Sequence, residues 1–317
     1  MGWIRVLALS GAACVLFSSL AAARATYTTF AADSVAGINS SNTVTGSNGS
    51  VGFLRTVDGS VTAFSVTGAK VTLPQTINDL GAVAGIYETD HLHGFVRSAE
   101  GDIATFDGPG ASDTYVVGIN NSGEVAGWYW DGATSDHALV RAPDGTLTTF
   151  DIPGENSTTP SSINEGGVIT GSYIGYDGFD HGFIRAANGT ITSFDVPGAN
   201  YGTVAESINI HGDVAGAYWV SNSIEYGFVR RADGTITTFD YEDCALFDPR
   251  GINRKQVVTG WCLLEKGGHF LGFVWRPNRA VRSFHVPGNG FHTRPAGIND
   301  EGVIVGEYNG GGFLRFP

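Results

Sequence analysis

The chain has 317 residues, 46 of them glycine and only one methionine, and its formal net charge is −13 at pH 7. A negative field of this size repels nucleic acid and anionic membranes, so we expect neither as a partner. Abundant glycine indicates many tight turns and short strands rather than helices.

Residues 1–25 have the pattern of a secretory signal peptide. A positive start ending at Arg5 precedes an apolar run over 6–22, and Ala23-Arg24-Ala25 fits the small-x-small cleavage rule. A lipid anchor at Cys14 is the alternative. No later segment has the roughly 18 uninterrupted apolar residues of a spanning helix. We therefore expect a secreted mature chain of residues 26–317, in the periplasm or the medium, with no membrane insertion.

Three sequence markers each recur seven times along the chain. The asparagine of an Ile-Asn dipeptide stands at Asn39, Asn78, Asn120, Asn164, Asn209, Asn253 and Asn299. Two other markers also occur seven times each: a strand-like Gly-Phe-aliphatic-Arg segment, and a Phe that ends a Thr-rich segment. Successive asparagines are 39 to 46 residues apart. Units of this length suit the blades of a β-propeller better than the repeats of a helical solenoid.

Each unit contains four short β segments, as in 116–120, 124–129, 137–141 and 146–152. Ile-Asn-x-x-Gly joins the first two and Asp-Gly or a relative joins the last two, both of which are tight-turn signals. The glycine of Gly-Phe, as at Gly94, should let a neighbouring sheet approach, onto an aromatic ring.

The two ends of the chain hold complementary parts of one unit. The segment at 26–30 is a fourth strand without its first three, and residues 312–317 are a third strand without its fourth. Pairing them joins the two ends of the chain and leaves only protected edges. We predict an all-β fold over residues 26–317: a seven-bladed β-propeller of four-stranded blades, closed by the N-terminal strand joining the last blade.

These motifs resemble the extracellular HAF repeat family. His137-Ala138-Leu139 is close to its His-Ala-Phe strand, and residues 119–125 and 208–214 match its Ile-Asn-x-x-Gly-x-Val segment. The family often carries Trp near the end of the His strand, where this chain mostly has Arg. The resemblance implies an exported bacterial repeat protein of unassigned function.

Cys244 and Cys262 are the cysteines of the expected mature chain. An isolated pair in an exported protein favours a disulfide, with free thiols as the alternative. Both lie in the sixth unit, which departs most from the repeat. This departure suggests that the unit is under a constraint other than the repeat pattern, although ordinary loss of the pattern explains it equally well. The residues to test are Glu242, Asp243, Asp248, Arg250 and Trp261.

The loops between second and third strands, and those between units, vary most and should share one face of the propeller, where function is expected. Aromatic rings beside carboxylates suit a sugar, which stacks on the ring and bonds the acids. The same rings also suit packing between blades. The candidate ligand-binding residues are Trp128, Tyr129, Trp130, Tyr173, Tyr218, Trp219, Glu242, Asp243 and Trp261.

Histidines recur at the start of the third strand, at His93, His137 and His181. Equivalent positions on successive blades are too far apart for one metal ion, whose ligands converge to about 2.0–2.2 Å. We expect each to bond a carbonyl or carboxylate of an adjacent blade, and we predict no metal site and no cofactor. Calcium in the Asp-rich loops 130–137 and 176–181 is a weak alternative.

These observations favour a monomeric binding module for an extracellular glycan or protein. The rival hypothesis is a carbohydrate-active enzyme, a polysaccharide lyase or glycoside hydrolase, on the same face. Such an enzyme needs a deep central pocket with a general base or paired carboxylates. No catalytic residue can be assigned from the sequence, because no nucleophile elbow, phosphate loop or zinc motif is present.

Overall fold

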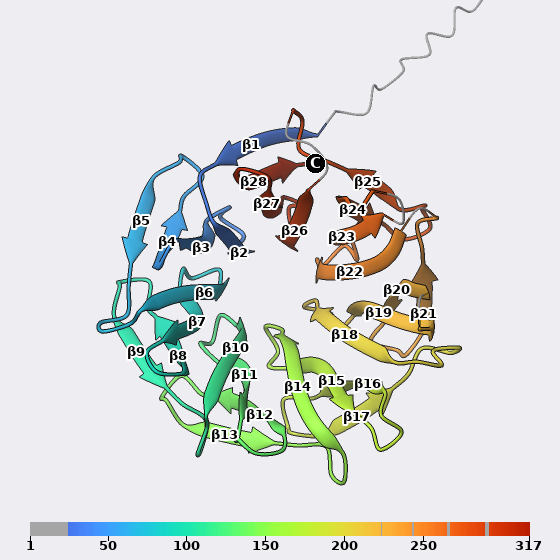
Figure 1. Ribbon diagram of the computed structural model, residues 1–317, viewed down its shortest axis with the longest axis horizontal. Coiled ribbons are helices and arrows are strands. Elements are labelled where there is room, and N and C mark those ends of the chain that lie inside the picture. The colour runs from blue at the N-terminus through green and yellow to red at the C-terminus, as the bar shows by residue number, and fades with distance from the viewer. Residues whose placement is uncertain (1–24, 223, 243, 265–266, 289–291) are drawn as a thin grey trace, which may run out of the picture.

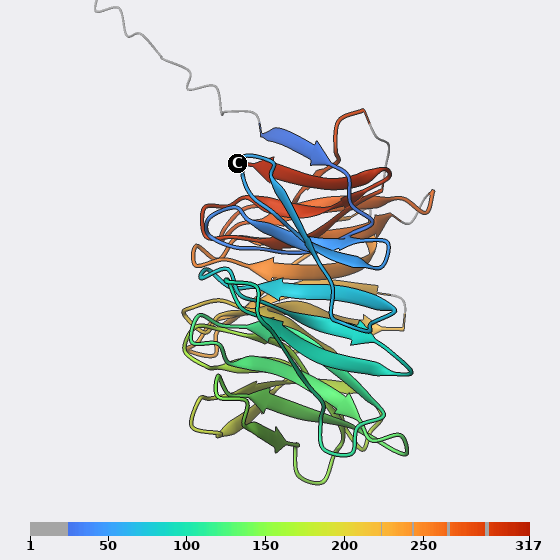
Figure 2. The ribbon, with the colours of Figure 1, turned by 90° about the vertical axis from the view of Figure 1, so that its left-hand side faces the viewer.

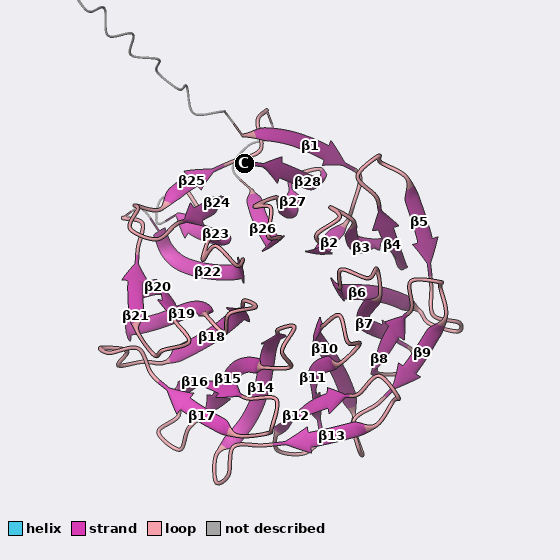
Figure 3. Ribbon diagram, turned by 180° about the vertical axis from the view of Figure 1, so that it is seen from behind, coloured by secondary structure: helices cyan, strands magenta, loops and turns pink. Residues whose placement is uncertain are grey.

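The computed structural model describes residues 25–222, 224–242, 244–264, 267–288 and 292–317. Its strands form seven sheets of four antiparallel strands each, set around a central axis (Figure 1). Strands and loops make up the described part of the chain (Figure 3), where no helix is long and apolar enough to cross a membrane. The predicted seven-bladed propeller is confirmed. The expected signal peptide falls on residues 1–24, outside the described residues, and on Ala25.

The blades are numbered along the chain, and each runs from its innermost to its outermost strand. Blades 1 to 3 contain β2 (Ser34–Ile38), β3 (Val44–Asn48), β4 (Val51–Arg55) and β5 (Val61–Phe64); β6 (Val71–Ile77), β7 (Val83–Glu88), β8 (Leu92–Arg97) and β9 (Ile103–Phe106); and β10 (Asp113–Ile119), β11 (Val125–Trp130), β12 (Asp136–Arg141) and β13 (Leu147–Phe150). Blades 4 and 5 contain β14 (Asn156–Ile163), β15 (Ile169–Ile174), β16 (Asp180–Arg185) and β17 (Ile191–Phe194); and β18 (Thr203–Ile208), β19 (Val214–Ser221), β20 (Ile224–Arg230) and β21 (Ile236–Phe239). Blades 6 and 7 contain β22 (Cys244–Ile252), β23 (Val258–Leu264), β24 (Phe270–Trp275) and β25 (Arg282–Phe284); and β26 (Thr293–Ile298), β27 (Ile304–Tyr308), β28 (Gly311–Phe316) and β1 (Thr26–Phe30).

Blade 7 is completed by the N-terminal strand, as predicted. β1 pairs antiparallel with β28, from Thr26 opposite Phe316 to Phe30 opposite Gly312. The strands of every blade run between the two faces of the disc (Figure 2). The face with the Ile-Asn and Asp-Gly turns is called the turn face. The opposite face, with the loops between second and third strands and between blades, is called the loop face.

A closed ring of side-chain hydrogen bonds joins all seven blades at the turn face. The Nδ2 atom of each Ile-Asn asparagine donates to the main-chain oxygen of the corresponding asparagine in the next blade, over 2.9 to 3.4 Å. The Oδ1 atom of the same side chain accepts the backbone N–H groups of its own turn, as Asn39 does from Ser41 and Thr43. The sequence prediction covered only this second role.

The layers between blades are built from the recurring phenylalanines and arginines. Phe95 of blade 2 is fully buried and meets Phe64 of blade 1 edge-to-face, with ring centroids 6.1 Å apart. The guanidinium of Arg97 lies 5.1 Å above the same Phe64 ring. Cation–π contacts of this kind repeat between blades, and Trp275 stacks on Phe239 where blade 6 lacks the arginine. The Arg near the end of the third strand is thus a packing residue.

The glycine of Gly-Phe does meet an aromatic ring, but within its own blade. A Cβ on Gly94 would lie 2.6 Å from the ring of Phe106, which is its cross-strand partner on β9. The expected approach of a neighbouring sheet is seen at two of these glycines: a Cβ on Gly52 would lie 2.9 Å from Pro74 of the next blade, and one on Gly312 would lie 2.8 Å from Val35. The ring contact itself is within the blade. The physical reason is that the outermost strand carries its ring inward over the blade, where only a residue without a side chain leaves room.

Candidate functional site

Every innermost strand contains a β-bulge at the same position. The strand registers shift between Val35 and Gly37 in blade 1, and at the equivalent place in each other blade. A bulge leaves one residue unpaired and re-aims its side chain. Here all seven unpaired residues line one cavity on the propeller axis: Ala36, Gln75, Val117, Ser161, Glu206, Arg250 and Ala296.

This central cavity has a volume of about 790 Å³. Its wall is neutral along blades 1 to 4 and charged along blades 5 to 7. Two of the seven bulge residues are charged, Glu206 of β18 and Arg250 of β22, and they sit on neighbouring blades. Arg294 of β26 and Glu307 of β27 continue the wall on blade 7, and Asp248 of β22 lies beside Arg250. We call Glu206, Asp248, Arg250 and Arg294 the charged sector.

Two contacts fix the geometry of the charged sector. Arg250 Nη2 donates to Asp248 Oδ2 over 2.6 Å. The guanidinium of Arg294 lies 3.7 Å above the ring of Phe270 and 5.5 Å above that of Trp261. The other carboxylate oxygen of Asp248, Oδ1, is buried without a hydrogen-bond partner. A buried acceptor left unpaired costs roughly 1–3 kcal/mol, and Asp248 is not one of the residues that line the cavity.

Burial shifts the carboxyl groups of this region toward the protonated form. Loss of hydration, reinforced by the nearby Asp248 carboxylate, raises the pKa of Glu206 to about 7. Loss of hydration also raises the pKa of Asp248, against the attraction of Arg250 and Arg294. Behind the cavity wall, burial raises the pKa of Glu225 to about 8, although its Oε2 accepts the Phe247 N–H. A carboxyl group with a pKa near 7 can both give and take a proton at neutral pH.

Two of the predicted tryptophans line the central cavity. Trp128 of β11 and Trp261 of β23 hold the same register position, one residue after the glycine that pairs with the bulged strand. The ring of Trp128 stacks on Tyr115 at a centroid distance of 3.9 Å. Trp130 is 41% exposed and Trp219 is partly exposed, and neither lines this cavity.

The three predicted tyrosines are buried inside their blades. Tyr129, Tyr173 and Tyr218 are 7 to 9% exposed, so little ring surface is open to a ligand. Tyr173 stacks on His181 with ring centroids 5.2 Å apart. Their burial supports the packing interpretation that the sequence left open.

The recurring histidines bond carboxylates, as expected, but within their own blades. The Nδ1 atoms of His93 and His137 lie 2.8 Å from Asp107 and 3.0 Å from Asp151, and His181 pairs with Asp195 in the same way. Each aspartate directly follows the outermost strand of the blade that holds its histidine. The expectation of a partner on the adjacent blade was therefore wrong, because that strand end returns beside the start of the third strand.

The predicted disulfide between Cys244 and Cys262 is confirmed. It ties the start of β22 to β23, the two strands that contribute Arg250 and Trp261 to the cavity wall. Glu242 precedes the bridge and is exposed, outside the residues that line the cavity. Asp243 lies outside the described residues. Contact of any predicted residue with a ligand stays a prediction.

Sequence reasoning missed Glu206 and Arg294 as site residues. Asp248 and Arg250 were noted only because the sixth unit departs from the repeat. The available signal was positional: Glu206 and Arg250 stand where the other five blades place Ala, Gln, Val or Ser. Charge at a repeat position that is otherwise neutral identifies the sector once the units are aligned on the bulge.

Comparisons with known proteins give the fold but no family. No family model matches the chain, and no curated protein does. Among solved structures, a virginiamycin B lyase from Staphylococcus aureus aligns with a TM-score of 0.66 at 14% identity, covering 92% of this chain and 99% of that one. The propeller domain of the Trilobed protease from Pyrococcus furiosus has a TM-score of 0.59 at 10% identity, with coverages of 86% and 91%. The Dos1 propeller has 0.55 at 10%, with 91% and 93%. At these identities the likeness establishes the β-propeller fold alone.

Proposed function

We propose that this protein is a secreted binding module that takes an extracellular glycan in its central cavity. The observation that carries the proposal is the convergence of Trp128, Trp261, Glu206, Arg250 and Arg294 on one cavity of about 790 Å³. Pockets of 300–1,000 Å³ with a few convergent polar groups are typical small-ligand sites. The resemblance to exported repeat proteins and the predicted signal peptide support an extracellular ligand.

The chemistry of the wall suits a sugar. Each tryptophan offers an apolar ring that can lie against the C–H face of a pyranose. The carboxyl groups of Glu206 and Glu307 can accept hydroxyl hydrogens, and the guanidinium groups of Arg250 and Arg294 can donate to hydroxyl oxygens. Since the lining carboxyl groups of Glu206 and Glu307 balance the guanidinium groups of Arg250 and Arg294, we expect a neutral or weakly charged glycan as the ligand.

The proposal is tested by thermal melting of the purified protein against a panel of polysaccharides and oligosaccharides. A ligand that binds only the native state raises the melting temperature by mass action. For a glycan found this way, Trp261→Ala and Trp128→Ala should each weaken binding by about 3- to 10-fold, the range expected for one lost aromatic contact. Trp130→Ala is the matched control, because its ring lies outside the cavity. If no glycan binds, or if all three variants lose affinity equally, the proposal fails.

A second candidate is catalysis on the same glycan, by a lyase or hydrolase mechanism. It is favoured by Glu206, whose pKa of about 7 suits a general acid or base, with the carboxylate of Asp248 nearby. The same mixtures are assayed for new sugar ends. Product that disappears in Glu206→Gln, while binding remains, assigns an enzyme. A bound glycan that stays intact over long incubation assigns a binding module.

A further inference from the structure

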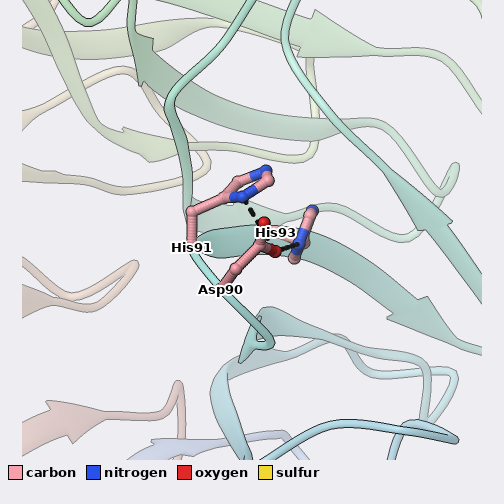
Figure 4. Close-up of side chains that lie close together, drawn as sticks. All are labelled: Asp90, His91 and His93. Atoms are coloured by element: carbon pink, nitrogen blue, oxygen red, sulfur yellow. Dashed lines mark ion pairs between the residues drawn. The ribbon is translucent and has the colours of Figure 1, made fainter.

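The loop between β7 and β8 brings together three side chains with metal-ligand chemistry. Asp90 and His91 belong to this loop, and His93 is the second residue of β8 (Figure 4). One ligand atom of each side chain lies within 4.8 Å of the others. We propose that Asp90, His91 and His93 form a Zn²⁺ site on the loop face of blade 2.

The distances are close to those of a tetrahedral zinc site. His91 Nδ1 lies 3.1 Å from Asp90 Oδ1, and His93 Nε2 lies 3.9 Å from the same oxygen. Ligands bound at 2.0–2.2 Å to a tetrahedral ion are about 3.3–3.6 Å from one another. Small rotations of the exposed Asp90 and half-exposed His91 side chains would bring all three to one ion. Three protein ligands leave the fourth position to water.

His93 is already held in the orientation that a zinc ligand needs. Its Nδ1 pairs with Asp107 Oδ1 over 2.8 Å, and its ring stacks on Tyr87 with centroids 4.8 Å apart. A carboxylate on the far nitrogen fixes the tautomer that presents a lone pair at Nε2 and raises its basicity. That nitrogen now lies 2.7 Å from Thr89 Oγ1, a contact that the ion would replace.

Blades 3 and 4 provide an internal comparison. His137 and His181 keep the carboxylate on Nδ1 and also face a loop carboxylate at Nε2, from Asp131 at 3.7 Å and Asp177 at 3.2 Å. Neither loop supplies a second imidazole. His91 is the addition in blade 2, and its ring centroid lies 4.0 Å from that of His93. The sequence prediction of no metal considered equivalent histidines on different blades, whereas this site is made by one loop and the start of the strand that follows it.

The donor set selects the metal. Two imidazole nitrogens and one carboxylate suit Zn²⁺, whereas Ca²⁺ takes six to eight oxygen ligands. The net charge of −13 also favours cations. The site is separate from the central cavity, whose lining residues include none of these three. Its assignment therefore does not depend on the proposed glycan.

The test uses the full secreted protein, purified without a polyhistidine tag and stripped with a chelator. Calorimetric titration with ZnCl₂ at pH 7.5 should show about one equivalent bound, and Co²⁺ should give the visible absorption of a low-symmetry site. We expect His91→Ala to weaken Zn²⁺ binding at least tenfold, and Asp107→Asn to weaken it roughly 10–100-fold through the orientation of His93. His137→Ala is the matched control and should bind as the parent protein does.

His91 is partly exposed in a loop, so His91→Ala should melt as the parent does without metal and remains informative if His93→Ala fails to fold. The proposal is overturned by any of three results: no Zn²⁺ binding up to millimolar concentration, equal binding by His91→Ala and the parent, or an equal loss in His137→Ala. Displacement of bound Co²⁺ by equimolar Ca²⁺ would also contradict it.

Discussion

Asn299 Nδ2 donates to the main-chain oxygen of Asn39 over 3.0 Å, although 260 residues separate the two. This contact joins blade 7 to blade 1 and closes the ring of asparagine bonds at the turn face. At the same time Asn299 Oδ1 accepts the Val303 N–H within its own turn, at 3.0 Å. A single side chain therefore shapes a hairpin and seals the propeller.

We expect Asn299→Ala to lower the free energy of unfolding by about 2 kcal/mol, because it leaves a buried carbonyl unpaired and removes a turn acceptor. Chemical denaturation measures the change. The control is Asn188→Ala, which removes only the local bond to the Thr190 N–H in an exposed turn and should cost less than about 0.5 kcal/mol. Equal losses in the two variants would show that the bond between blades adds nothing.

Deleting Tyr27–Phe30 should destabilise the whole domain. These residues form most of β1, and their loss exposes the edge of β28 and removes the Phe30 ring that packs on Phe53. The melting transition should fall as one cooperative step. Hydrogen exchange should speed up even in blade 3, on the far side of the ring (Figure 1). A truncated protein that melts like the full one would mean that β1 is not needed for closure.

The architecture was predictable because each structural role recurs at a fixed place in the sequence. Seven Ile-Asn turns, seven strand-ending phenylalanines and the divided blade at the two termini all specify one ring. Each of these is a local pattern that repetition amplifies. The disulfide was predictable for a different reason, since only one pair was available in the expected mature chain.

The site was less predictable, because it depends on register rather than on motif. Glu206 follows Ala205 in an ordinary strand sequence, and only the bulge turns its side chain toward the axis. The partner of His93 was equally hidden, since Asp107 lies 14 residues away at the end of the outermost strand. Tyr129 was predicted to be a ligand-binding residue, yet its ring is buried beside His137. The position of an aromatic residue in the sequence near the loop face does not show whether its ring packs inside the blade or is open to a ligand.

Removing the disulfide should destabilise the protein by about 3 kcal/mol, as expected for a short closed loop. The variant is Cys244→Ser with Cys262→Ala, since Cys262 is fully buried and a hydroxyl there would lack a partner. Differential scanning calorimetry compares both proteins with and without reductant. Reductant should lower the melting temperature of the parent only. If the parent is equally stable in reductant, the bridge contributes no stability.

Stability should fall as the pH rises from 5 to 8. Burial raises the pKa of Glu225 to about 8 from an ordinary value of 4.5, so the folded state binds this proton more tightly than the unfolded state does. The free energy of unfolding then decreases with pH between those two values, by at most about 1.4 kcal/mol per pH unit for one group. Glu206, with a pKa of about 7, adds to the same trend.

Glu225→Gln tests the assignment, because the amide is neutral at every pH and its oxygen can still accept the Phe247 N–H. We expect denaturation curves of this variant to depend less on pH between 5 and 8, with a gain in stability over the parent at pH 8 and little change at pH 5. Glu100→Gln removes an exposed charge and should retain the slope of the parent. If the stability of Glu225→Gln depends on pH as strongly as that of the parent, Glu225 is already ionised in the folded protein at neutral pH and the assignment is wrong.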